Sequence, residues 1–177
     1  MKKWFAVIGD PIAQSKSPEM HNAWYEEENV DAAYIPVHVK HEHLQQAVAS
    51  FKLLGASGWN VTIPHKQTII PFLDELDELA AKMGAVNTVV RTAEGKLKGY
   101  NTDGPGFVKA LEQVIGTNKR DAPILLIGAG GAARGIAFAL QLIGYSDITI
   151  ANRTVENAQQ IIDEMNAGQA ISLLQAE

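Results

Sequence analysis

The 177-residue chain contains no cysteine. Disulfide bonds, thiolate metal sites and cysteine nucleophiles are therefore excluded, and the composition fits a reducing compartment. An excess of positive charge is also missing, because the formal net charge is −5. This balance favours neither a nucleic acid nor an anionic membrane as a partner. With 46% hydrophobic and 20% charged residues, the composition is typical of a soluble globular protein.

Long uninterrupted hydrophobic runs are absent as well. The most apolar stretch, residues 123–144, is broken by five glycines and by Arg134, so it makes a poor membrane span. The apolar run after the two N-terminal lysines stops at Asp10–Pro11 and is too short for a signal peptide. We expect a cytoplasmic protein that acts on small molecules, without a nucleic-acid or membrane partner and without a metal.

The chain alternates strand-like and helix-like segments, which is typical of the α/β class with a mainly parallel sheet and helices on both faces. In the first part we expect strands at 4–8, 34–39 and 59–63, a hairpin at 86–91 and 97–101, and helices at 17–28, 41–54, 68–83 and 102–115. For the helix at 68–83, an interruption at Pro71 is left open. In the second part we expect strands at 124–128, 147–151 and 171–174 and helices at 132–143 and 155–165. The chemistry changes near Asp103, which predicts two α/β units, 1–103 and 104–177.

A glycine-rich loop, GAGGAARG, joins an apolar strand to a helix in the second unit. Gly128, Gly130 and Ala133 fit the G-x-G-x-x-G/A pattern, in which the first glycine permits a tight turn and the second lets backbone amides approach a pyrophosphate. The helix N-terminus adds unpaired N–H groups and partial positive charge. The pattern predicts a dinucleotide site at Gly128, Ala129, Gly130, Gly131 and Ala132.

The next predicted strand ends at Asn152–Arg153–Thr154. A site for NAD carries an acidic group here for the ribose 2′-hydroxyl, whereas an arginine can pair with a 2′-phosphate. Asn152, Arg153 and Thr154 therefore predict NADP as the cofactor. Arg153 could also be a solvated residue at a strand end, and the nearby Glu156 would repel a 2′-phosphate.

The segment GWNVTIPHKQT places Lys66 on a turn after a strand-like run that carries Asn60 and Thr62. Lys66 is either a solvated surface lysine or a group that handles a proton over a bound substrate. The sequence indicates no role for its neighbour His65.

Several short motifs together resemble the shikimate dehydrogenase family over essentially the whole chain and in the family's order. They are SKSPEMHN, NVTIPHK, AVNTVV, GYNTDGPGF, GAGGAAR and NRT, of which NVTIPHK and NTDGPGF are the specific ones. The resemblance implies an NADP-dependent oxidoreductase that interconverts 3-dehydroshikimate and shikimate in aromatic amino-acid biosynthesis. It also implies a substrate-binding and catalytic domain over 1–103 and a partial Rossmann domain over 104–177.

The resemblance also assigns roles to individual residues. Ser15 and Ser17 would hold the substrate carboxylate, and Asn60, Thr62 and Asn87 would bond the ring hydroxyls. Lys66 and Asp103 would be the catalytic pair, since reduction of a ketone leaves an alkoxide that needs a proton and nearby positive charge. Each role competes with a structural one, because Ser17 and Asp103 could cap helices and the amides could satisfy loop backbone.

Relatives continue beyond residue 177, so we expect a second sheet of three strands, with an exposed edge, and weak or no dehydrogenase activity in this chain. Two alternatives remain open: a quinate/shikimate dehydrogenase with relaxed cofactor choice, and a non-catalytic shikimate-binding module. We expect a monomer or a homodimer.

Overall fold

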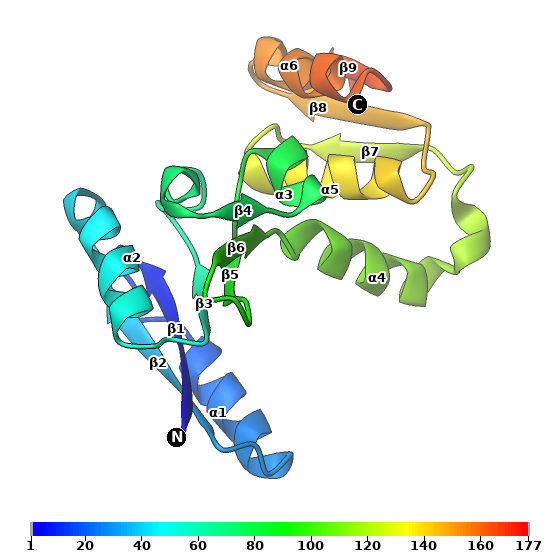
Figure 1. The fold of residues 1–177 in the computed structure, drawn as a ribbon. Coiled ribbons are helices and arrows are strands. Elements are labelled where there is room, and N and C mark those ends of the chain that lie inside the picture. Colours follow the sequence, from blue (N-terminus) through cyan, green and yellow to red (C-terminus); the bar gives the residue numbers. More distant parts are fainter. Residues whose placement is uncertain (1, 177) are drawn as a thin grey trace. The chain divides into compact units, whose positions relative to one another are not determined.

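The computed structural model of the chain describes residues 2–176 and divides into two compact units, one up to Tyr100 and one from Asn101 on (Figure 1). Both units combine helices and strands, which confirms the α/β class. No helix within residues 2–176 is long and apolar enough to cross a lipid bilayer.

The first unit is built on a six-stranded sheet in the order β2-β1-β3-β5-β6-β4. Its strands are β1 (Lys3–Gly9), β2 (Ala32–His38), β3 (Gly58–Val61), β4 (Glu75–Leu76), β5 (Thr88–Arg91) and β6 (Leu97–Tyr100). β1 is parallel to β2 and β3, and β4 is parallel to β6. β5 is antiparallel to β3 and β6, so the predicted hairpin is confirmed.

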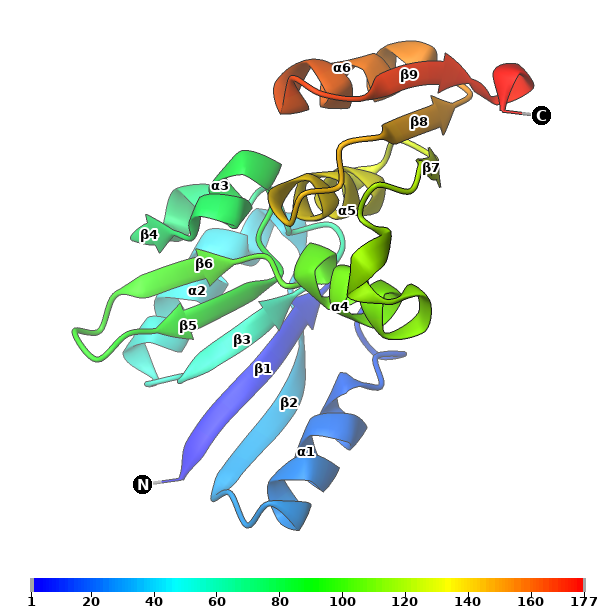
Figure 2. The same ribbon diagram turned by 90° about the vertical axis from the view of Figure 1, so that its right-hand side faces the viewer.

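Helices lie on both faces of this sheet (Figure 2). The side chains of β1 accordingly alternate between two cores. Ala6 and Ile8 pack with Val48 and Phe51 of α2 (Leu44–Leu53), whereas Val7 packs on the face of α1 (Ser17–Glu27). A strand buried on both faces reads as a continuous apolar run. This is why β1 could be recognised from sequence.

A continuous helix over residues 68–83 is wrong, whereas the interruption considered at Pro71 is present. A short 3₁₀ helix, Ile70–Phe72, is followed by β4, and an α-helix, α3 (Glu78–Met83), begins only after Asp77. Pro71 lacks the N–H that a continuous helix requires. Asp77 caps α3 through its side chain, which accepts hydrogen bonds from the backbone N–H groups of Leu79 and Ala80. Similarly, the segment expected as one helix from 41 begins as a 3₁₀ helix, His41–His43, before α2.

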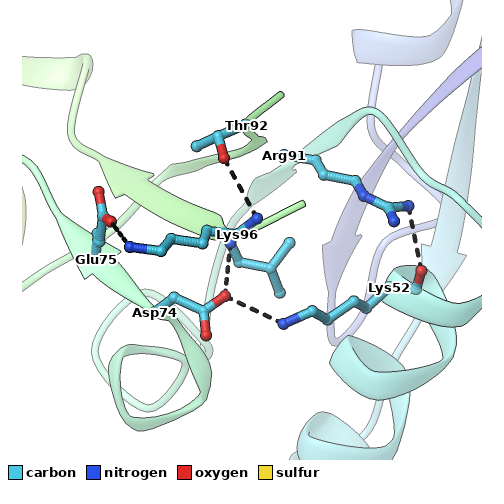
Figure 3. Close-up of polar contacts among 7 residues, drawn as sticks. Lys52, Asp74, Glu75, Arg91, Thr92 and Lys96 are labelled. Atoms are coloured by element: carbon cyan, nitrogen blue, oxygen red, sulfur yellow. Dashed lines mark hydrogen bonds and ion pairs between the residues drawn. The ribbon is translucent and has the colours of Figure 1, made fainter. Parts of the chain in front are cut away.

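Asp74 connects three parts of the first unit (Figure 3). Its Oδ2 accepts a 2.7 Å hydrogen bond from the backbone N–H of Leu97 in β6. The same oxygen forms a 3.2 Å ion pair with the ammonium group of Lys52 in α2. Its own backbone N–H donates to the Leu97 carbonyl at 2.9 Å. The hydrogen bond from Leu97, followed by the Lys52 ammonium, lowers the pKa of this carboxyl group. Asp74 therefore anchors the 68–83 segment to the hairpin.

The second unit contains a three-stranded parallel sheet in the order β7-β8-β9, as predicted. Its elements are α4 (Asp103–Ile115), β7 (Ile124–Ile127), α5 (Gly131–Leu142), β8 (Ile148–Asn152), α6 (Val155–Met165) and β9 (Gln169–Ser172), with short 3₁₀ helices at Thr117–Lys119 and Leu173–Gln175. α5 and α6 contact each other through the Arg134–Glu164 ion pair and through Gln141, which donates to the Met165 carbonyl. β7 lies at the edge and exposes Leu125 and Ile127.

The anchoring by Asp74 can be tested by Asp74→Asn. A carboxyl group with a lowered folded-state pKa stabilises the fold above its unfolded pKa, about 3.9, and loses that contribution as the pH falls through the folded-state value. We therefore expect the variant to melt at a lower temperature than the wild type at pH 7, with a difference that shrinks below about pH 4. The control is Asp31→Asn, since the Asp31 carboxylate lies in an exposed 3.9 Å pair with Lys2. If the difference in melting temperature between Asp74→Asn and the wild type is the same at pH 7 and pH 3, the charge of Asp74 does not contribute to the anchoring.

Candidate functional site

Polar side chains gather at one edge of the first unit's sheet, where β3 ends and β5 begins. Asn60 lies on β3, Thr62 follows it, and Asn87 directly precedes β5. Because β5 is antiparallel to β3, its first residues lie beside the last residues of β3, with Asn60 paired to Thr88. The backbone N–H of Val61 donates to the Asn87 carbonyl at 2.8 Å. The structure thus brings together three of the five residues expected to contact a substrate.

Thr62 has a fixed orientation because its methyl group packs against Gly9 at the end of β1. A Cβ atom at Gly9 would lie 2.5 Å from Thr62 Cγ2 and 3.2 Å from Ile12 Cδ1. The Thr62 backbone N–H also donates to the Ile8 carbonyl at 2.9 Å. Because the methyl group of Thr62 is directed at Gly9, its hydroxyl group must occupy another of the staggered positions on Cβ.

Ser15 and Ser17 lie in the loop that leaves β1 and enters α1, and both are half-buried. The capping role considered for Ser17 is wrong, since Lys16 occupies the N-cap position and Ser17 is the first residue of α1. Instead, the Ser17 N–H faces the Ser15 hydroxyl oxygen at 3.3 Å. The Ser15 hydroxyl group is thereby held at the turn that opens α1.

Lys66 lies on the turn after β3 and is half-buried. Its carbonyl accepts a 2.7 Å hydrogen bond from the backbone N–H of Val86, the residue before Asn87. The backbone of Lys66 is therefore tied to the same sheet edge that carries Asn60, Thr62 and Asn87.

His65 fixes this turn from the other side, a role that the sequence did not reveal. Its side chain is fully buried, and Nε2 lies 2.6 Å from the Val39 carbonyl after β2. Since a carbonyl only accepts, Nε2 carries the proton. The His65 backbone N–H also donates to the Thr62 carbonyl at 2.9 Å, so the turn that carries Lys66 is tied to two strand ends.

A second group missed by the sequence analysis comprises Tyr34 and Thr88, which hydrogen-bond to the site amides. Tyr34 donates to Asn60 Oδ1 at 2.6 Å, and Thr88 contacts both Asn60 and Asn87. Burial, with a smaller contribution from Tyr25, raises the pKa of Tyr34 well above its usual range. The phenol therefore remains protonated and able to donate.

In the second unit, the glycine loop follows β7 and opens α5. Gly128 has a φ of 105°, a conformation that glycine adopts without strain. A Cβ atom at Gly128, Gly130 or Gly131 would meet nothing within 4 Å. The open space above these backbones and the first amides of α5 suit a pyrophosphate, so the residues present fit a dinucleotide.

The predicted cofactor residues at the end of β8 lie beside this loop. Gly128 N–H donates to the Ala151 carbonyl at 2.8 Å, which joins the loop to β8. Asn152 Nδ2 donates to the Thr154 carbonyl at 2.8 Å, and the intervening Arg153 is exposed. The structure brings Gly128–Ala132 and Asn152–Thr154 to one edge of the second sheet.

Asp103 is the first residue of α4, and Thr102, rather than Asp103, occupies the N-cap position. The backbone N–H of Asp103 instead donates a 3.1 Å hydrogen bond to Oδ1 of the buried Asn101 side chain. Gly104 holds this turn against α5, because a Cβ atom there would lie 2.5 Å from the Gly135 carbonyl oxygen and 2.7 Å from Ala139 Cβ. Asp103 is thus placed in the second unit, whereas Lys66 belongs to the first.

The fold and the two polar edges define a two-unit α/β protein whose second unit has a Rossmann-type glycine loop. Residues 7–89 match the shikimate dehydrogenase substrate-binding domain, and residues 110–177 match the shikimate/quinate 5-dehydrogenase domain. The chain therefore belongs to the shikimate dehydrogenase family.

Relatives and solved structures agree with this assignment. A shikimate dehydrogenase (NADP(+)) of Lysinibacillus sphaericus is 72% identical over the whole chain, which spans 64% of that relative's length. A Thermus thermophilus shikimate 5-dehydrogenase, solved with NADP(H) and shikimate, is 36% identical with a TM-score of 0.85 over 94% of this chain and 62% of its own. A Listeria monocytogenes shikimate 5-dehydrogenase, solved with shikimate and NAD, is 33% identical with a TM-score of 0.90, over 97% and 61%.

The packing of Thr62 on Gly9 generates a prediction. Gly9→Ala forces a methyl group into the Thr62 side chain, and overpacking of this kind destabilises by about 1–3 kcal/mol. We expect this loss in the free energy of unfolding measured with denaturant. Adding Thr62→Ser removes the opposing methyl group and should recover part of the loss, because the Ile63 carbonyl oxygen still lies 3.1 Å from the new Cβ atom. A double variant no more stable than Gly9→Ala would show that Thr62 is not what the new methyl group meets.

Proposed function

We propose that the protein to which this chain belongs reduces 3-dehydroshikimate reversibly to shikimate with NADPH. The observation that carries the proposal is the Lys66–Val86 backbone hydrogen bond, which supports a placement of the ammonium-bearing residue beside Asn87, Asn60 and Thr62. Ligands of open α/β sheets bind at such strand ends. Family membership supports the same reaction.

In this proposal NADPH, when bound, supplies the hydride to the ketone carbon. Gly128–Ala132 would hold its pyrophosphate, and Asn152–Thr154 would face its adenosine ribose, with Arg153 pairing with the 2′-phosphate. The exposed Arg153 and the turn held by Asn152 support this assignment. Glu156, in the first turn of α6, would act against it through charge repulsion.

The substrate's carboxylate would be held by the hydroxyl groups of Ser15 and Ser17. Asn60, Thr62 and Asn87 would bond its ring hydroxyls. Lys66 would give a proton to the developing alkoxide and stabilise its charge, and Asp103 would orient Lys66 and bond a substrate hydroxyl. We also propose a cytoplasmic location, as a monomer or homodimer, since both proposed reactants are small, water-soluble molecules.

A second candidate is a quinate/shikimate dehydrogenase with relaxed cofactor choice. The description of the matching family over residues 110–177 names both acids. Rates measured with NADP and NAD on shikimate and on quinate separate the two candidates. Binding of shikimate without any turnover would instead favour a non-catalytic shikimate-binding module.

The deciding experiment follows NADPH oxidation with 3-dehydroshikimate. It compares this chain with a chain extended at residue 177 by the corresponding segment of the Lysinibacillus sphaericus relative. We expect strong turnover from the extended chain and weak or no turnover from residues 1–177. Absence of turnover in the extended chain, despite normal folding, would overturn the proposal.

Lys66→Ala in the extended chain tests the proton transfer. We expect kcat to fall by about 10²–10⁴, the usual contribution of a positioned acid–base group, while the melting temperature stays near that of the wild type. The control is Lys109→Ala, because Lys109 is exposed on α4. Near-normal turnover of Lys66→Ala would rule out the catalytic role.

Gly130→Ala tests the cofactor site. The added methyl group meets no protein atom within 4 Å, so the fold should tolerate it, but it enters the space assigned to the pyrophosphate. We expect the Kd for NADP+ to rise about tenfold or more, equivalent to at least about 1.4 kcal/mol. The matched control is Gly106→Ala, which has equal space within α4 and should raise stability by about 0.5–1 kcal/mol with unchanged NADP+ binding. Equal affinities of the two variants for NADP+ would show that the cofactor does not bind at this loop.

A further inference from the structure

Helix α1, whose first turn carries Ser17, is attached to the first unit with little hydrophobic burial. No residue of α1 is buried, and Met20 and Trp24 are 43% and 49% exposed. The helix nevertheless lies alongside β2, the strand at the edge of the sheet (Figure 2). Hydrophobic stabilisation is proportional to the apolar area removed from water. The polar contacts between α1 and β2 therefore carry more of the attachment than they would in a core helix.

The side chain of Asn22 connects α1 to β2 through three hydrogen bonds. Its Nδ2 donates to the Pro18 carbonyl and to the Tyr34 carbonyl, each at 2.8 Å, and its Oδ1 accepts from the Tyr34 backbone N–H at 2.9 Å. A carbonyl oxygen only accepts and a backbone N–H only donates, so the amide has one possible orientation. Asn22 is thus an oriented link between the first turn of α1 and one residue of β2.

The backbone groups that Asn22 contacts lie at the free edge of the sheet. Within residues 2–176, β2 pairs with β1 alone, so the N–H and carbonyl of Tyr34 that bond to Asn22 point away from the rest of the sheet. The amide therefore occupies the place of a neighbouring strand. A shift of α1 along β2 would break both bonds to Tyr34 at once, which fixes the helix at one position on the strand.

Tyr34 is a firm attachment point that also reaches the candidate substrate residues. It is 3% exposed, and its ring is stacked on His21 of α1 with centroids 4.3 Å apart and an interplanar angle of 8°. Its hydroxyl donates to Asn60 Oδ1 at 2.6 Å. One residue of β2 therefore contacts both α1 and an amide that the proposed function assigns to the ring hydroxyls.

The turn that carries Ser15 and Ser17 is held at both of its ends. At its start, Ile12 packs in the same small core as Tyr34, and the Ile12 carbonyl accepts from the Ser15 N–H at 3.0 Å. At its end, Pro18 directly follows Ser17, and the Pro18 carbonyl accepts from Asn22. Loss of the Asn22 amide would let this second end move relative to β2.

We propose that Asn22 is a positioning residue that sets the distance between the two serines, Ser15 and Ser17, and Asn60. The inference rests on the proposed function, in which the serines hold the substrate carboxylate and Asn60 bonds a ring hydroxyl. The site then selects a ligand whose carboxylate and hydroxyl groups lie at a fixed separation. Hydrogen bonds weaken steeply when their distance and angle depart from the preferred values, so a displaced serine turn would recognise the carboxylate poorly. Proton transfer by Lys66 would not depend on Asn22.

Asn22→Leu, which keeps a side chain of similar size but removes the amide, tests this in the extended chain described above. We expect the KM for shikimate to rise about three- to tenfold, the effect of losing one neutral hydrogen bond, with kcat and the KM for NADP+ unchanged. Asn22→Ala removes the same bonds and should give the same result. In a Ser15→Ala/Ser17→Ala background, Asn22→Leu should hardly change kcat/KM for shikimate, because the amide acts through the two serines.

Two controls separate positioning from a general loss of stability. Gln45→Leu makes the same change from an amide to an apolar group at an exposed position of α2. Asp77→Ala removes the cap of α3, which accepts from the backbone N–H groups of Leu79 and Ala80, and should lower the melting temperature. Both controls should retain the wild-type KM for shikimate.

A wild-type KM in Asn22→Leu, or an undiminished loss in the background without the two serines, would overturn the inference. If the wild-type extended chain fails to turn over shikimate, the proposed function fails, and amide hydrogen exchange decides the inference. Asn22→Leu should accelerate exchange of the backbone N–H groups of Ser15 and Ser17 about threefold or more relative to Gln45→Leu. Equal exchange in these two variants would overturn it.

Discussion

The antiparallel register of β3 and β5 is the constraint on which the polar edge of the first unit depends. It places Asn60 opposite Thr88 and lets the Asn87 carbonyl accept from both Val61 and Asn60. A slip of β5 by one residue would turn Thr88 to the other face of the sheet from Asn60. The parallel pairing of β1 with β3 then brings Gly9 against Thr62, so backbone pairing alone fixes much of the site.

Local signals in the sequence were sufficient for most of the fold and for the glycine loop. The apolar run of β1, the hairpin and the G-x-G-x-x-A turn each depend on residues that are neighbours in the chain. The segment 68–83 could be read in this way only in part. Pro71 signals one break, but the start of α3 depends on Asp77 as a cap, and the position of the segment depends on Asp74, whose partners Leu97 and Lys52 are 23 and 22 residues away. Contacts of that separation leave no periodic pattern in the sequence.

The candidate site also combines residues that the sequence reveals with residues that only the structure reveals. Lys66, Asp103 and the polar residues near the strand ends are predicted from short motifs, whereas His65, Tyr34 and Thr88, which contact this region, have no motif of their own. His65 is defined by a bond to the Val39 carbonyl, 26 residues away, and Tyr34 by a bond to Asn60, also 26 residues away. Such residues become visible only when the strands are aligned. The capping roles weighed for Ser17 and Asp103 failed for a related reason, since Lys16 and Thr102 occupy those positions.

The contact between α4 and α5 at Gly104 has a mechanical consequence. The backbone of Gly104 touches the Gly135 carbonyl region and Ala139 with no side chain of its own in between. Interiors packed this closely resist sliding and transmit displacement. The first turn of α4 therefore behaves as a rigid extension of α5, and any tilt of the helix that begins at the glycine loop carries the carboxylate of Asp103 with it.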